Sequence, residues 1–373
     1  MDPVLRRFGQ GAAVSTAAWI GSLVLLFWYF HLATPVSLLA NLVVVPIAFC
    51  ILAIALLSIM SAPLLPWLSV VFNHANWFLA TVVIAIVHLF AHLPAGHYYV
   101  PHPPRLGGAL AKLTVLDVGS GAAVHLQTRD QDWLFDCGSE RDYDRLVREY
   151  LHTAGINTLD GLLLTHGDAQ HIGGASRLLS EIRPRLLIDN PAQDRSSVHK
   201  RLRRMLDEKK WPVTHPARGE VLQIGPDVTC AVVHPPRDFS SSMSDDQSLV
   251  LRLEVARGPA ILLMSDSGLA TEKTMVHSAI PVRSDIIVKG QHHSGKSGSN
   301  ELLDAVRPQL IVATSRDFPQ HERVDDQWAD EVQRRNIKLF KQSDTGAVQI
   351  WLRPDGWEAK SYLTGETFRS VSR

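Results

Sequence analysis

The chain has 373 residues, with 37 basic and 37 acidic side chains, a formal net charge of zero and 46% hydrophobic residues. This length is more than one ordinary domain needs, and the balanced charge excludes a protein that binds nucleic acid through a large positive surface. The three cysteines, Cys50, Cys137 and Cys230, show no CxxC spacing. We interpret them as small buried hydrophobes, because nothing in the pattern supports a Cys137–Cys230 pair.

The N-terminal part of the chain is uncharged, since no Asp, Glu, Lys or Arg occurs between Arg7 and Arg105. So long an uncharged stretch cannot cover a surface that faces water. A signal peptide would need only one apolar region of fewer than about 20 residues, whereas several occur here. The pattern therefore predicts a membrane region over residues 1–93. Its transmembrane helices are expected at residues 11–33, 35–60 and 77–93.

The orientation of this region depends on the number of crossings. Arg6 and Arg7 precede the first span, and basic residues favour the cytoplasmic side. Three crossings would then place the C-terminal domain outside the cytoplasm. Residues 61–75 are interpreted as an interfacial or re-entrant piece; if they cross as well, the orientation reverses.

A linker rich in proline and glycine is predicted over residues 94–110, followed by a domain at 111–360 and a C-terminal tail at 361–373. In the domain, apolar runs alternate with amphipathic stretches, which suits two sheets sandwiched between helices. Helices are expected at residues 141–153, 174–182, 196–210, 300–306 and 325–334. Strands are expected at residues 113–118, 123–127, 133–135, 161–164, 228–233, 248–255, 260–264, 286–288, 310–313 and 348–352.

Potential metal ligands follow the short apolar run that ends at Leu164. His166, Asp168 and His171 lie within six residues of one another, between this run and a helix-like segment. Loops at strand ends are where a rigid scaffold presents ligands, and neutral imidazole and carboxylate suit zinc or manganese. Gln170 stands where a dinuclear hydrolase would normally carry a carboxylate.

Three further strand ends carry the same kinds of side chain. Asp266 follows one apolar run, His292 and His293 follow another, and the acidic pair at residues 245–246 precedes a third. Taken alone, Asp266 fits a helix cap equally well, and the histidine pair could be structural. The basic helix expected at 196–210 is interpreted as a solvated face, with phosphate contact as the alternative.

Several short sequence motifs of this chain together resemble the C-terminal part of the ComEC competence proteins, which import transforming DNA. An uncharged segment precedes them here as in that family, and its stretch PVSLLANLVVVP at 35–46 is similar to the end of the family's membrane channel region. The matching phrases of the C-terminal part are LDVGSG at 116–121, FDCG at 135–138, LTHGDAQHIGG at 164–174, DQSLVL at 246–251, LMSD at 263–266, VKGQHHS at 288–294 and DTGAV at 344–348.

This resemblance implies an α/β protein: a four-layer αββα metallo-β-lactamase-like domain preceded by transmembrane α-helices. It also implies a channel for single-stranded DNA and a metal-dependent nuclease that degrades the strand not imported, with one or two zinc or manganese ions. By motif match, the first-loop ligands would be His166, Asp168 and His171, with Asp168 also a proton acceptor. Asp266 would be the bridging carboxylate, and His292 or His293 the last histidine. Supporting positions would be Asp117, Asp136, Gln170, His234 and His321.

The chain departs from the family at residues that matter for charge. Relatives carry Asp where this chain has Gln170, and Gln-Gly-Asp where it has Ser120, Gly121 and Ala122. An amide offers a carbonyl oxygen but no negative charge, and two neighbouring cations need anions to offset their repulsion. A site with one ion, or with none, is therefore an alternative to a dinuclear centre.

Three functions stay open on the sequence. The first is a metal-dependent phosphodiesterase or nuclease within a DNA-uptake apparatus of the bacterial inner membrane. The second is a catalytically decayed, membrane-anchored module that guides DNA or docks a channel-forming partner chain. The third is a metallohydrolase of small molecules, since the fold hosts many chemistries. DNA and membrane lipid are the expected partners in the first two.

Overall fold

The structure is a computed structural model, and it describes residues 3–93, 96–101, 106–192 and 196–370. Two compact units divide the chain. One comprises residues 1–102 with 152–157, and the other residues 103–151 with 158–373.

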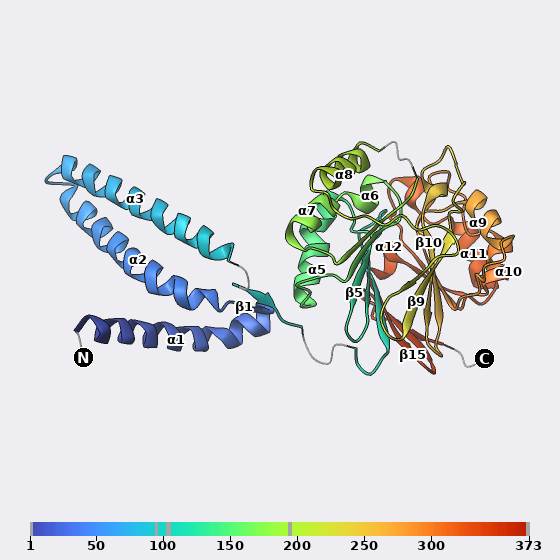
Figure 1. Cartoon of the computed structure of the whole chain (residues 1–373), viewed down its shortest axis with the longest axis horizontal. Coiled ribbons are helices and arrows are strands. Elements are labelled where there is room, and N and C mark those ends of the chain that lie inside the picture. The colour runs from blue at the N-terminus through green and yellow to red at the C-terminus, as the bar shows by residue number, and fades with distance from the viewer. Residues whose placement is uncertain (1–2, 94–95, 102–105, 193–195, 371–373) are drawn as a thin grey trace. The chain divides into compact units, whose positions relative to one another are not determined.

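The N-terminal unit is built on three long helices (Figure 1): α1 (Pro3–Phe30), α2 (Val36–Ser61) and α3 (Pro66–Ala91). Each is long and apolar enough to cross a membrane, as judged by length and composition. Two short strands, β1 (Leu32–Ala33) and β2 (Tyr98–Tyr99), pair antiparallel beside them. The three predicted spans are thus helical. However, the third begins earlier than expected, because Pro66 starts α3 at a position where proline favours a helix. Most of the predicted interfacial piece is therefore helical.

A small polar cluster joins α2 to α3 near their connecting turn. The hydroxyl of Ser58, which is buried, lies 2.9 Å from that of Ser69 and 2.8 Å from Oδ1 of Asn73. In an apolar environment such groups need partners, since an unpaired one is costly. The cluster therefore fixes the pairing of these two helices.

The C-terminal unit contains two sheets. The first is an eight-stranded sheet in the order β17-β16-β15-β3-β4-β5-β6-β7. Its β5, β6 and β7 run parallel, whereas its other neighbouring strands are antiparallel. Its strands are β3 (Ala111–Val115), β4 (Val124–Gln127), β5 (Asp132–Phe135), β6 (Gly161–Leu164), β7 (Leu186–Asp189), β15 (Val348–Arg353), β16 (Gly356–Ser361) and β17 (Thr367–Arg369).

The second sheet has seven strands in the order β14-β13-β12-β11-β10-β9-β8. Here β11 to β14 run parallel and β8 to β11 antiparallel. Its strands are β8 (Val221–Gln223), β9 (Val228–His234), β10 (Val250–Val255), β11 (Ala260–Leu263), β12 (Ile286–Lys289), β13 (Leu310–Ala313) and β14 (Lys338–Lys341).

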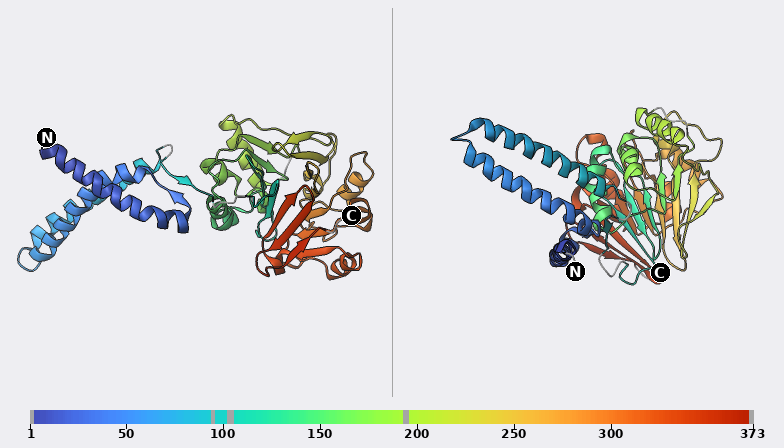
Figure 2. Two further views of the ribbon diagram at one scale, coloured as in Figure 1. Left: turned by 90° about the horizontal axis from the view of Figure 1, so that it is seen from below. Right: turned by 60° about the vertical axis from the view of Figure 1, so that its left-hand side comes forward.

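Helices cover the outer face of each sheet (Figures 1 and 2). One group follows strands of the first sheet and the other those of the second, which gives the order helix, sheet, sheet, helix. The helices and turns are α4 (Glu140–Asp142), a π turn (Tyr143–Val147), α5 (Arg148–Thr153), α6 (Ala169–Ile172), α7 (Ala175–Glu181), α8 (Ser197–Glu208), α9 (Leu269–Val276), α10 (Asn300–Val306), α11 (Asp326–Arg334) and α12 (Gln342–Thr345), with 3₁₀ turns at Asp245–Gln247 and Gln320–Glu322. The four-layer α/β architecture expected above is confirmed.

The main core lies between the two sheets. Alternate residues of facing strands, such as Leu113 and Leu126 of one sheet and Leu251 and Val312 of the other, are fully buried in a single apolar cluster. A second cluster packs the outer face of the second sheet against its helices. Burial of this kind is the main source of stability. The sandwich holds both sheets at a fixed separation and brings their strand ends together.

The cysteines allow a first prediction. Burial raises the pKa of the Cys230 thiol to about 12, and burial, then the neighbouring Asp136, raises that of Cys137. In a fragment of residues 106–373, neither thiol should react with a thiol reagent at pH 8 until urea unfolds the fragment, because the thiolate is the nucleophile. Rapid reaction of two native thiols would contradict this burial. Cys50 differs from the expectation, since it is exposed on α2.

Candidate metal centre

Four side chains meet at one edge of the C-terminal unit because parallel strands end there. Asp136 follows β5 and His166 follows β6, whereas Asp266 follows β11 and His292 follows β12. Within each pair the strands run parallel, so their carboxyl ends lie side by side. Since the sheets pack face to face, the two pairs approach each other. His171, from α6, joins them.

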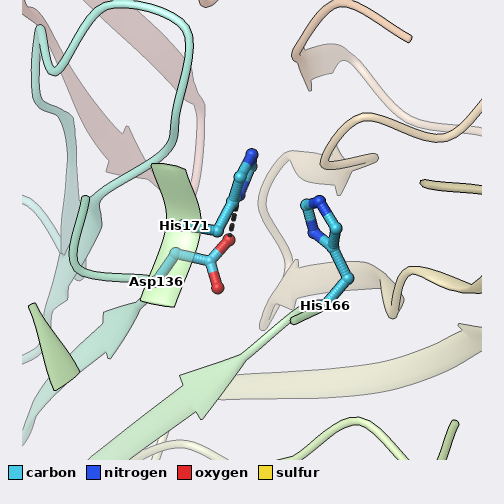
Figure 3. Close-up of side chains that lie close together, drawn as sticks. All are labelled: Asp136, His166 and His171. Atoms are coloured by element: carbon cyan, nitrogen blue, oxygen red, sulfur yellow. Dashed lines mark hydrogen bonds and ion pairs between the residues drawn. The ribbon is translucent and has the colours of Figure 1, made fainter. Parts of the chain in front are cut away.

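His171 connects the two sheets. Its Nδ1 lies 2.7 Å from Oδ2 of Asp136 (Figure 3), and its Nε2 lies 3.0 Å from Oδ2 of Asp266. Although burial acts to lower the pKa of His171, the charges of Asp266 and Asp136 raise it well above its usual value. An imidazole that donates from both nitrogens carries a positive charge. This cation in turn lowers the pKa of Asp266, against the raising effect of burial.

Asp136 acts as an anchor for the neighbouring loops. Its Oδ1 accepts from the backbone N–H of Thr165 at 2.8 Å, and its Oδ2 accepts from the Thr165 hydroxyl at 2.6 Å as well as from His171. The backbone of Asp136 has φ of 55°, a conformation that Asp tolerates better than most residues. With both oxygens engaged, Asp136 orients the ring of His171.

His166 is buried, and its ring centroid lies 4.1 Å from that of His171. Its Nδ1 is within 3.3 Å of two hydroxyls, those of Thr165 and Ser265. Its Nε2 has no hydrogen-bond partner among the described residues. Burial, and then the charge of His171, lowers the pKa of His166. A neutral imidazole with an unused nitrogen is what a metal ion requires.

Three more buried polar atoms beside this cluster lack partners within the described part of the chain. They are Oδ1 of Asp266, Nε2 of His292 and Oδ1 of Asp246, and the last two lie 3.5 Å apart. Leaving buried polar atoms unpaired is costly. Among the described residues, the group whose ligand atoms lie close enough together for one ion is Asp136, His166 and His171, within 4.8 Å of one another.

Glycines allow the close packing of this edge. A Cβ on Gly290 would lie 1.8 Å from Oδ1 of Asp266, and one on Gly268 would lie 2.6 Å from the ring of His292. Any side chain at either position would therefore displace a candidate ligand.

The remaining candidates from the sequence differ in their burial. Asp168 and Gln170 are exposed, as is His293, whereas His292 is buried. Asp117 is half-buried, and burial raises its pKa. His234 is buried, its Nε2 lies 2.9 Å from the carbonyl oxygen of Asp246, and burial lowers its pKa to about 4. His321 lies in the turn Gln320–Glu322, and its side chain is outside the described part of the structure.

Sequence reasoning missed the hydroxyls that tie the centre together. Thr165 and Ser265 come from different sheets, and their hydroxyl oxygens lie 2.8 Å apart. Both stand directly before a candidate ligand, and that position is the only signal the sequence offers. Asp246 was noted as one of an acidic pair, but its proximity to His292 depends on the tertiary fold.

Lys289 is a second buried charge near the centre. Its ammonium donates to the carbonyl of Gly290 at 2.8 Å and lies 4.9 Å from the ring centroid of Trp328. Burial lowers its pKa from 10.5 to about 8. Between these two pH values the unfolded chain binds more protons than the folded one, so the contribution of Lys289 to stability rises with pH.

We therefore expect Lys289→Met to stabilise the 106–373 fragment relative to wild type, and to do so more at pH 7 than near pH 9.5. The difference between the stabilisation at the two pH values should be on the order of 1–2 kcal/mol. Urea unfolding at both pH values measures this difference. Lys273→Met, at an exposed position on α9, is the control and should show no such pH dependence. An identical difference at both pH values would contradict the buried charge.

The sandwich of two mixed sheets, with histidines and aspartates at their common edge, defines a protein of the metallo-β-lactamase class. Residues 116–222 match the metallo-β-lactamase superfamily model, and residues 3–119 match the competence protein family model. These two matches lie in tandem along the chain, the order expected from its resemblance to the ComEC-type competence proteins.

Two curated relatives extend along most of the chain. The competence protein ComA of Neisseria gonorrhoeae is 27% identical over 89% of this chain and 48% of its own length. The ComE operon protein 3 of Bacillus subtilis is 22% identical over 93% of this chain and 52% of its own. A metallo hydrolase from Ignicoccus hospitalis is similar in structure, at 14% identity and a TM-score of 0.43, over 70% of this chain and all of that one. The chain spans about half the length of the curated relatives it matches. Its three long apolar helices indicate a membrane protein, and the metallo-β-lactamase fold implies a divalent metal.

Proposed function

We propose that this chain works in DNA uptake as a membrane-anchored, metal-dependent phosphodiesterase. The observation that carries the proposal is the convergence of His166, His171 and Asp266 from two sheets, with a ligand atom of His166 and another of Asp266 left without partners. His292 stands beside them with its Nε2 also unpartnered. Neutral imidazole and carboxylate together suit zinc or manganese.

A bound ion would lower the pKa of a water molecule to about 7 and neutralise charge on a phosphoryl oxygen. Two histidines of the chain have features that suit them to bind such an ion. His166 is neutral because it is buried, and Asp136 fixes the ring of His171 through Nδ1. His171 must release its second proton before its Nε2 can act as a ligand. Asp168, exposed in the wall of the cavity beside His166, would accept a proton from solvent or substrate.

One ion is better supported than two. Gln170 carries no charge and is exposed, so it adds no anion to the buried cluster. The same features favour a second candidate function, a decayed module that binds DNA or a channel-forming partner without cleaving it.

The proposed location follows from the membrane helices. Three crossings of the bacterial inner membrane with the N-terminus in the cytoplasm would place the C-terminal unit outside it. There the domain would meet incoming DNA before a single strand enters a channel. Cysteine labelling of intact cells at an introduced exposed site of the C-terminal unit tests this topology.

The full chain, purified in detergent and loaded with zinc or manganese, tests the function. We expect about one ion per chain by elemental analysis and cleavage of a labelled DNA strand that depends on the ion. Absence of both metal and cleavage would contradict the enzyme and favour the decayed module. Metal-dependent hydrolysis of a small ester together with inertness toward DNA would instead favour a small-molecule hydrolase.

A further inference from the structure

A polar cavity of about 700 Å³ opens beside His166 and extends to the start of α8. Its wall includes His166 and Asp168 from the first loop, Asn190 after β7, and Lys200 on α8. Serines complete it, among them Ser242 and Ser244, whose side chains are exposed. Among the described lining residues, Lys200 is the only lysine or arginine and Asp168 the only carboxylate.

The first turn of α8 is held rigidly against this cavity. His199 is buried, and its Nε2 lies 2.9 Å from Oδ2 of Asp189, the last residue of β7. Arg203 donates to the same carboxylate at 3.3 Å, and to the carbonyl of Asn190 at 3.0 Å and that of Ala192 at 2.9 Å. This network neutralises Asp189 and fixes the end of β7 to α8. The backbone that carries Lys200 is therefore fixed even though the Lys200 side chain is exposed.

The chemistry of the cavity favours an anion with several oxygens. The N-terminus of α8, a helix of twelve residues, has a positive dipole end. Ser196 caps it by accepting from the backbone N–H groups of Val198 and His199. Hydroxyl groups and a lysine are the usual partners of phosphate. A second feature is His166, which lines the same cavity and whose buried Nε2 lacks a partner among the described residues.

We propose that this cavity binds the phosphodiester group next to the one held at the metal centre, with Lys200 as its cationic ligand. The substrate class is a single-stranded nucleic acid, because the cavity is continuous with His166 and an extended strand carries a phosphate at each nucleotide. This inference rests on the proposed function, since it assigns the neighbouring phosphate to the same strand. Asp168 opposes binding of this anion in the absence of a metal ion.

A binding assay separates this subsite from catalysis. The full chain in detergent is titrated into a short fluorescein-labelled oligothymidylate in EDTA, and anisotropy gives the affinity at several salt concentrations. Lys200→Gln should weaken binding about tenfold at low salt and reduce the slope of log K against log salt by about 0.7. Lys200→Arg should restore most of the affinity, and Asp168→Asn should strengthen binding because it removes a like charge.

The matched control is Lys209→Gln, which removes the same charge from the exposed C-terminal end of the same helix. It should leave affinity within about twofold of wild type. Equal effects of Lys200→Gln and Lys209→Gln would overturn the subsite, as would an oligothymidylate that wild type does not bind. The subsite and the enzyme can fail separately. If the protein cleaves DNA with metal but Lys200→Gln leaves the oligothymidylate affinity unchanged, only the subsite is contradicted. If Lys200→Gln weakens binding but no cleavage occurs, only the phosphodiesterase activity is contradicted.

Discussion

Replacing His166 with alanine should abolish metal binding and strand cleavage while leaving the fold intact. The substitution removes a buried imidazole whose pKa is lowered by burial and whose Nε2 has no partner in the described structure. Loss of an inner ligand should weaken metal affinity by more than about 100-fold, since even an outer partner is worth about 10- to 100-fold. Elemental analysis and cleavage assays on the full chain measure both effects.

Stability should respond less than metal binding does. Removing a buried ring leaves a cavity, but it also removes a polar atom that is costly to leave unpaired, by about 1–3 kcal/mol. We expect urea unfolding of the metal-free 106–373 fragment to change by less than about 2 kcal/mol. His277→Ala, at an exposed position after α9, is the control and should keep its metal. A His166→Ala protein with wild-type metal content would rule out this centre.

The second large effect is expected from a residue that is no ligand at all. Gly290→Ala should empty the metal centre, because the added Cβ would lie 1.8 Å from Oδ1 of Asp266. Asp266 must then move, and its hydrogen bond to His171 is lost together with the charge pairing that raises the pKa of His171. Overpacking of this kind costs about 1–3 kcal/mol, in addition to the lost bond.

Metal content of the full chain and urea unfolding of the 106–373 fragment measure the two consequences. Gly21→Ala, in the first membrane helix with nothing within 4 Å of its added Cβ, is the control for metal content. Gly268→Ala should behave like Gly290→Ala, since its Cβ would press on the ring of His292. Retention of metal by Gly290→Ala would show that Asp266 is not a ligand.

Two strands buried on both faces were predicted from the sequence with their bounds. The strand expected at residues 161–164 has those bounds in β6, and that expected at residues 310–313 has those of β13. Both are continuous apolar runs, which a buried parallel strand requires. β8, β14 and β17 were missed because they are short and partly polar edge strands. β17 even lies in the range predicted as a tail, because pairing with β16, rather than its own composition, makes it a strand.

The candidate site was only partly predictable for a similar reason. His166, His171 and Asp266 could be grouped because each belongs to a recognisable phrase at the end of a strand. Asp168 and Gln170 belong to the same phrase, yet their side chains are exposed. Successive residues of a helix differ by about 100° in direction, so with His171 turned inward on α6, Gln170 faces solvent. The motif predicts the spacing of candidate ligands along the chain, whereas the backbone conformation determines which of their side chains point inward.

The bridge between His171 and Asp266 joins residues 95 positions apart in the chain. If the proposed function holds, neither sheet on its own would supply a complete set of ligands, so a chain still emerging from the ribosome would not yet act on DNA. A proteolytic cut that separates the sheets would have the same effect. Ion binding would then favour the assembled sandwich over the separated sheets.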